Sequence, residues 1–320
     1  MLKKVLLNLL KAGLALGLLA WLIQSGKLNW DLLAGLLKYP NRLLLAFGFS
    51  FINLFLVTWR WRHLLSARSS EKQSLVSLGA ANWIGVFFSS VLPGSITGDI
   101  VKIFYVKRGS VPMSKPFLLF SCFLDRLMGL TGLILLMGVF SIANYSSLLE
   151  LSPKLAPMLT FNFFLFAAVV SSLLVFFFAP GIIETTLRAT AKVLPSSKIP
   201  QRLSDLWQDL RAAKAQMGWA ILISIIVQFF GVVIFHLLVS PQYETELSLN
   251  MVLSFIPLGF MAIALPIAPG GLGVGHAAFQ SLFGFAGEQN GANFFNMYFV
   301  VTMTFNLLGV VPWLLSRKKS

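Results

Sequence analysis

Two charged side chains inside a very apolar stretch are the clearest candidates for chemistry in this sequence. Asp125 and Arg126 are adjacent within segment 116–144. If that segment crosses a membrane, each charge costs about 2.5–3.5 kcal/mol, so the pair is kept for function or as a structural ion pair. Neighbours on a helix point about 100° apart, so these two are not expected to satisfy only each other. We expect Arg126 to pair with Asp99 or, alternatively, Asp125 to pair with Lys102. A contact of Arg126 with a lipid phosphate stays open.

A chain break before this pair has the composition of a helix start inside a membrane. Apolar segment 75–92 stops at a Pro-Gly pair, and both residue types end a helix. Ser95 or Thr97 can cap the helix that follows, and the free N–H groups of such a start attract anionic groups. A simple turn at the membrane surface is the alternative. The residues of this first candidate site are Pro93, Gly94, Ser95, Thr97, Asp99 and Lys102.

A second break follows apolar segment 249–265 in the C-terminal half. Its glycines can form a nest of backbone N–H groups for an anion, or can let helices pack closely. His276 comes next, either as a buried hydrogen-bonding residue or as a proton carrier. It forms no ligand pattern with His63 or His236, and the single Cys122 excludes a cysteine cluster, so no metal or cofactor is expected. The candidate residues here are Pro269, Gly270, Gly271, Gly273 and His276.

The composition indicates the class of fold that must position these residues. The chain has 320 residues, of which 57% are hydrophobic and only 11% are charged, against about 25% charged residues in an ordinary soluble domain. These values exclude a soluble enzyme, a disordered chain and a secreted disulfide scaffold. They indicate an all-α polytopic membrane protein, with residues 1–320 forming one integral membrane domain.

The apolar segments predict about six full transmembrane helices and two re-entrant helical hairpins. The two segments that end at Pro/Gly breaks are interpreted as hairpins that enter the membrane from opposite sides, which predicts an inverted repeat with halves at about 1–145 and 157–317. Hydropathy counting alone would report six to eight membrane segments. The expected full spans are 5–23, 43–65, 116–144, 157–179, 219–240 and 294–315.

The net charge of +14 is interpreted as orientation, because Lys and Arg collect on the cytoplasmic side of membrane proteins. Segment 59–63 (WRWRH) is expected to form an aromatic and basic collar at that interface. Polar segment 181–217 is expected to be a cytoplasmic loop with an amphipathic helix near 200–215. Most basic residues then fall on one side, which predicts a multi-pass protein of the bacterial inner membrane with both termini in the cytoplasm. An eight-span topology would place residues 102–115 on the opposite side or need a further crossing.

Three short motifs in order resemble a known family. They are Leu92-Pro93-Gly94 with Gly98-Asp99-x-x-Lys102, then Leu124-Asp125-Arg126-Leu127, then Pro269-Gly270-Gly271-Leu272-Gly273-Val274. Together they resemble the flippase-like family of the lysylphosphatidylglycerol synthase transmembrane region, over about residues 3–315. That family includes the N-terminal membrane half of the multiple peptide resistance factor and its stand-alone relatives.

The resemblance implies an inner-membrane protein that handles polar or anionic lipids and moves them between leaflets. It assigns Asp99 and Lys102 to the first hairpin and makes Asp125 and Arg126 the charged pair of the family. The glycines of the second hairpin are Gly270, Gly271 and Gly273. Two positions depart from the family pattern: Lys102 stands where arginine is expected in many relatives, and His276 where glutamate is expected. The second departure puts the local charge and any proton coupling in doubt. The soluble aminoacyl-transfer domain would follow such a region, and the chain ends at Ser320, so lysyl transfer is not expected.

The favoured interpretation is therefore a lipid-binding and lipid-translocating protein whose partners are membrane lipids with anionic or zwitterionic headgroups. A membrane-embedded glycosyltransferase of lipid-linked sugars is one alternative, although no convincing catalytic constellation is present. A non-catalytic membrane partner of a separate lipid-modifying enzyme is the other. No nucleic acid is expected. The lipid, the direction, the energy source and a homo-oligomeric state stay open.

Overall fold

The computed structural model describes most of the chain, and within the described residues every regular element is a helix. The all-α polytopic fold expected from composition is thereby confirmed. The expected first span at 5–23 lies outside the described residues. The described residues are 36–67, 73–91, 96–107, 113–193, 199–244, 246–264, 271 and 273–316.

Five described helical segments are long and apolar enough to cross a membrane, and each coincides with an expected span. Their lengths of 25 to 29 residues exceed the about 20 residues that a bilayer core requires. Segment 153–178 is the most exposed of them, which suits a helix that faces lipid. The helices are α3 (Pro40–Leu65), α6 (Lys115–Ala143), η1 with α8 (Pro153–Leu155 and Ala156–Phe178), α11 (Lys214–Val239) with η2 (Ser240–Gln242), and α14 with α15 (Gly291–Leu307 and Val310–Leu315).

Two pairs of shorter helices form the expected hairpins: α4 (Leu75–Val91) with α5 (Ile96–Lys107), and α12 (Leu249–Ala264) with α13 (Val274–Phe285). The 17 residues of α4 rise only about 25 Å, less than the about 30 Å of a bilayer core. A Cβ on Gly85 would lie 2.8 Å from the carbonyl oxygen of Gly98, so the two backbones are in direct contact. The hairpin is therefore tight, and the chain returns to the side from which it came.

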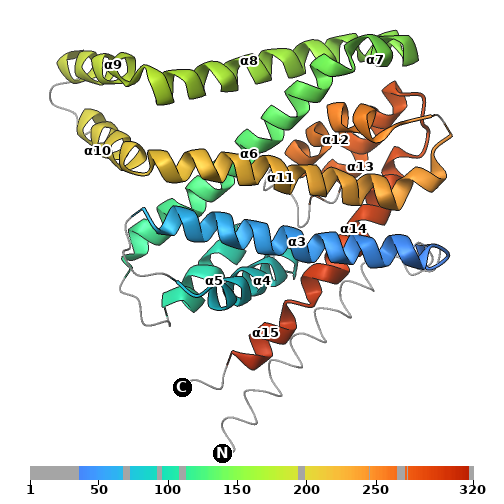
Figure 1. Ribbon diagram of the computed structural model, residues 1–320, viewed down its shortest axis with the longest axis horizontal. Helices are drawn as coiled ribbons and strands as arrows, with labels where there is room; N and C mark the ends of the chain where they lie inside the picture. The colour runs from blue at the N-terminus through green and yellow to red at the C-terminus, as the bar shows by residue number, and fades with distance from the viewer. Residues whose placement is uncertain are drawn as a thin grey trace, which may run out of the picture.

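The two halves repeat the same order of elements in opposite directions. A long helix, a short-helix hairpin and a second long helix form α3 to α6, and the same series recurs as α11 to α15. Both α3 and α11 contain 26 residues, and both α5 and α13 contain 12. Arg42 near the start of α3 donates to the Leu237 carbonyl near the end of α11, so the two helices pack antiparallel. Figure 1 shows the hairpins at opposite ends of α3 and α11, as an inverted repeat requires.

The polar segment between the repeats folds into two helices, α9 (Pro180–Val193) and α10 (Ile199–Ala212), which lie together at one end of the molecule (Figure 1). Only α10 was predicted. Arg211 pairs with Glu184, and the Lys214 ammonium donates to the Phe177 carbonyl over 2.7 Å. The first contact joins α10 to α9, and the second joins the start of α11 to the end of α8. The remaining helix, α7 (Tyr145–Leu151), lies at the opposite end.

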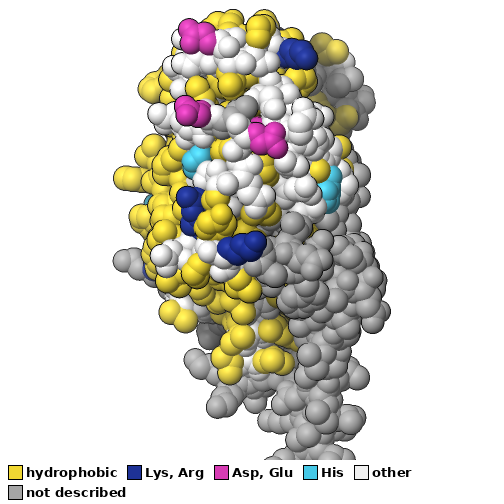
Figure 2. Space-filling model, turned by 90° about the vertical axis from the view of Figure 1, so that its right-hand side faces the viewer, with side chains coloured by type: hydrophobic (Ala, Val, Ile, Leu, Met, Phe, Trp, Pro, Cys, Tyr) yellow, Lys and Arg dark blue, Asp and Glu magenta, His cyan; other side chains and the backbone are white. Residues whose placement is uncertain are grey.

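The main apolar core lies largely between α11, α12, α13 and α14, and stacked phenylalanine rings form part of it. Phe235 stacks on Phe279 with ring centroids 4.9 Å apart, and Phe283 and Phe295 continue the cluster. This packing fixes the second hairpin against the long helices. Figure 2 views the end that carries α7 and the start of α3, where few charged side chains are visible.

Candidate functional site

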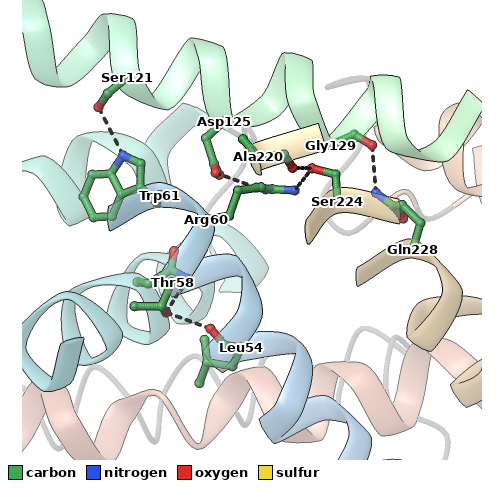
Figure 3. Close-up of polar contacts among 11 residues, drawn as sticks. Leu54, Thr58, Arg60, Trp61, Ser121, Asp125, Gly129, Ala220, Ser224 and Gln228 are labelled. Carbon is green, nitrogen blue, oxygen red and sulfur yellow. Dashed lines mark hydrogen bonds and ion pairs between the residues drawn. The ribbon is translucent and has the colours of Figure 1, made fainter. Parts of the chain in front are cut away.

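A buried ion pair and a hydrogen bond to it join three membrane helices (Figure 3). The Arg60 Nε of α3 donates to the Asp125 Oδ1 of α6 over 2.8 Å, and its Nη1 donates to the Ser224 Oγ of α11 over 2.9 Å. Arg60 is 5% exposed and Asp125 is 7% exposed. The hydroxyl of Ser224 donates its own hydrogen bond to the Ala220 carbonyl oxygen. The guanidinium is thus neutralised and further hydrogen-bonded away from solvent.

This arrangement corrects two expectations. The sequence suggested Lys102 as an alternative partner for Asp125. In the structure Asp125 pairs with Arg60 instead. Arg60 was assigned to the interfacial collar, yet only the outward face of that segment stays exposed: Trp59 is exposed, whereas Arg60 and Trp61 are buried. The signal was available in the sequence, because small or polar residues at Ala46, Ser50 and Thr58 mark the buried face of the same helix.

The expected pair of Arg126 with Asp99 is confirmed. The Arg126 Nε lies 2.7 Å from the Asp99 Oδ2, and the two side chains are 44% and 21% exposed. Because Asp99 is in the first turn of α5, this contact fastens the first hairpin to α6 on an open face. A role for the pair in binding a lipid phosphate stays a prediction.

Lys102 is buried on α5 at 4% exposure. Its Nζ lies 3.8 Å from the centroid of the Trp61 ring, a distance at which the ring face attracts a cation. The Trp61 Nε1 in turn donates to the Ser121 Oγ over 3.1 Å (Figure 3). Thr97 lies at the start of α5, whereas the predicted loop residues Pro93, Gly94 and Ser95 lie outside the described residues.

The second break is described only at its end, because Pro269 and Gly270 lie outside the described residues. Gly271 has a φ of +73°, and a Cβ there would lie 2.5 Å from the Ile263 Cβ. Gly273 has a φ of +80° with no neighbour within 4 Å of such a Cβ. Gly271 therefore serves close packing against α12, while Gly273 supplies the left-handed turn that begins α13.

His276 is a hydrogen-bonding residue that joins α13 to α14. Its Nδ1 accepts from the Gly273 N–H over 3.2 Å, and its Nε2 lies 2.6 Å from the Asn296 Oδ1. An accepting Nδ1 leaves Nε2 as the donor, which is the neutral tautomer. Asn296 was not among the predicted residues. Of the two alternatives for His276, this geometry fits the structural one.

A cavity of about 510 Å³ lies between the two repeats, bounded by α3, α4, α11, α12 and α14. Its walls are mainly apolar, with Phe260, Phe299 and Phe305 among them. None of the predicted site residues that the structure describes lines it. Neutral polar residues on separate helices form no local motif, which is why the sequence did not reveal this cavity. The polar side chains that line it are Ser50, Asn53, Asn82, Ser90, Gln228, Tyr298, Thr302 and Asn306.

Three of the four amides in this lining are held by neighbouring helices. The Asn306 Nδ2 donates to the Ser90 Oγ over 3.0 Å, and the Gln228 Nε2 donates to the Gly129 carbonyl over 3.0 Å. Asn82 donates more weakly to Thr58 over 3.3 Å. Asn53 differs, because its Oδ1 is buried and has no hydrogen-bond partner in the structure.

In the described part of the chain, five membrane-length helical segments, two opposed hairpins and a cavity at the repeat interface define a multi-pass membrane protein with an inverted-repeat core. Residues 8–309 match the family model described as the lysylphosphatidylglycerol synthase TM region. Because this match spans most of the chain, the protein belongs to that family, and the resemblance drawn from the motifs is confirmed. The comparison with curated proteins found no match, and neither did the comparison with solved structures.

Proposed function

We propose that this protein binds the polar headgroup of a membrane lipid in the cavity between its two repeats and carries it from one leaflet to the other. The observation that carries the proposal is the place of the cavity, which lies between helices of both repeats and beside α4 and α12. In transporters with inverted repeats, the substrate site lies at such an interface and is reached alternately from either side. Membership of a family named for a lipid-modifying synthase supports a lipid as the substrate.

The charged residues of the first hairpin are assigned a separate role in this proposal. Asp99 and Arg126 are partly exposed on the surface of the protein, so in this proposal they meet a headgroup before it enters the cavity. Arg60 and Asp125 keep the helices around the cavity in register. The proposed location is the inner membrane, with the basic α9–α10 segment in the cytoplasm.

The test is reconstitution in vesicles that contain acyl-chain-labelled lipids, with an impermeant quencher outside. Wild-type protein is expected to expose inner-leaflet label to the quencher. Gly231→Leu is expected to slow this movement, because Gly231 lines the cavity and a Cβ there has only Phe260 within 4 Å, at 3.5 Å. Gly218→Leu is the matched control on the same helix, since Gly218 does not line the cavity. Wild-type vesicles that behave like protein-free vesicles, or an equal effect of both variants, would overturn the proposal.

A further inference from the structure

The polar side chains among the described lining residues of the cavity are all uncharged. Their polar atoms belong to amides and hydroxyls, and among the described lining residues there is no Lys, Arg, His, Asp or Glu. Amide and hydroxyl groups both donate and accept hydrogen bonds, so they match a ligand that does the same. A phosphate offers only acceptors and a charge, and burying a charge without a counter-charge is far more costly than burying a hydroxyl that is hydrogen-bonded.

The basic side chains described near this region are already engaged. Arg60 is bound by Asp125 and Ser224, and Lys102 lies against the Trp61 ring. Arg126 is bound by Asp99 on the outer surface. A phosphate inside the cavity would therefore have to break one of these contacts to gain a counter-charge.

One residue of the described lining carries a buried side-chain acceptor without a hydrogen-bond partner. The Oδ1 of Asn53 is buried, belongs to a residue of the cavity wall and has no partner. A buried acceptor without a partner is destabilising, so a ligand donor that reaches it would stabilise the complex. The complementary ligand atom is a donor, and a hydroxyl supplies one without bringing a charge.

We infer that the cavity selects an uncharged, hydroxyl-rich headgroup, such as a glycosyl group, over headgroups that carry a phosphate. The inference rests on the proposed function and names its substrate class. It departs from the anionic or zwitterionic headgroup expected from the sequence, because that expectation relied on Lys102 and Arg126 as available cations. Asn53 is assigned as the acceptor for a headgroup hydroxyl.

The experiment places acyl-chain-labelled glucosyl diacylglycerol and, separately, labelled phosphatidylglycerol in the same reconstituted vesicles. The neutral lipid is expected to cross at least about tenfold faster, which corresponds to about 1.4 kcal/mol. Equal rates, or a faster phosphatidylglycerol, would overturn the inference and leave the proposed function standing. If neither lipid moves, the proposed function fails and the inference with it. Uptake of radiolabelled methyl glucoside is expected to be absent, and its appearance would replace the lipid headgroup by a free sugar.

Variants then test Asn53 itself. Asn53→Leu is expected to reduce the ratio of neutral to anionic lipid movement about tenfold, because the headgroup loses its acceptor. This ratio does not depend on how much protein is folded. Gln216→Leu is the matched control, since Gln216 also has a buried amide oxygen without a partner but does not line the cavity. An unchanged ratio in Asn53→Leu, or the same fall in the control, would contradict the assignment.

Discussion

Arg60 shows how a single buried charge can organise this protein. Its guanidinium contacts one residue of α6 and one of α11, so three helices from both repeats meet at one side chain. Removing two charges from a polar environment is costly, and their attraction offsets that cost only when geometry and extra hydrogen bonds are good. Here the 2.8 Å contact and the Ser224 hydroxyl meet that condition.

At this residue scale, Asp125→Ala is expected to lower the free energy of unfolding by about 3–5 kcal/mol, because it leaves Arg60 buried without a counter-charge. Thermal unfolding of the purified protein in detergent measures the loss. The double variant Arg60→Met with Asp125→Leu is expected to recover most of it.

The control for that experiment is Glu184→Ala, which removes the acidic half of the more exposed pair with Arg211. Exposed pairs contribute about 0–1 kcal/mol, so little change is expected. If Asp125→Ala were no more destabilising than this control, the buried pair would not be an organising contact.

The residues also show what sequence reasoning could and could not reach. The pair of Asp99 with Arg126 was predictable, because two opposite charges in apolar segments close in sequence have few other partners. The partner of Asp125 was not, because Arg60 sits in a segment whose aromatic and basic composition is that of a membrane interface. The cavity was missed for another reason: Asn53, Asn82, Gln228 and Asn306 come from four helices, and only the fold brings them together.

At the scale of elements, the first hairpin depends on the direct contact of α4 with α5. Gly85 and Gly98 allow the two backbones to meet, and the polar pair of Asp99 with Arg126 then fastens the hairpin to α6. Small residues commonly permit such close approach between membrane helices. The Pro and Gly residues of the breaks thus predicted where the helices end, whereas the packing glycines within them gave no comparable signal.

Gly85→Ala is expected to destabilise the protein by about 1–3 kcal/mol, since the added methyl group meets backbone atoms of Gly98 that cannot move aside alone. The melting temperature in detergent checks this. Gly48→Ala is the matched control, because a Cβ on Gly48 meets nothing within 4 Å and alanine favours a helix. We expect Gly85→Ala to lower the melting temperature and Gly48→Ala to leave it unchanged or raise it. Equal melting temperatures would contradict the tight hairpin.

At the scale of the whole molecule, the two repeats place matching elements on opposite sides of the cavity. The long helices α3 and α11 have equal lengths and run antiparallel against each other. Each carries a short hairpin at its end, so the cavity has one hairpin from each repeat beside it. This symmetry is what lets one site be reached from either leaflet in the proposed function.

The topology makes a prediction at the same scale. In a Cys122→Ala background, single cysteines at Lys192 of α9 and at Glu246 before α12 are expected to react with an impermeant thiol reagent from opposite sides of the membrane. Lys192→Cys is expected to react from the cytoplasmic side, because basic segments are retained there. Labelling of intact cells compared with inverted vesicles makes the measurement. Reaction of both cysteines from the same side would contradict the five described crossings.

The long sequence separation within the Arg60 contact also has a consequence for how the protein is made. Asp125 follows Arg60 by 65 positions and Ser224 by 164. At about 5–20 residues per second, the ribosome delivers the carboxylate about 3–13 s after the arginine. Arg60 lies near the end of its helix, so its long side chain can reach the headgroup region during that interval. The sequence order therefore imposes an order of contacts, because the buried pair can form only after α6 has been synthesised and the Ser224 contact only after α11.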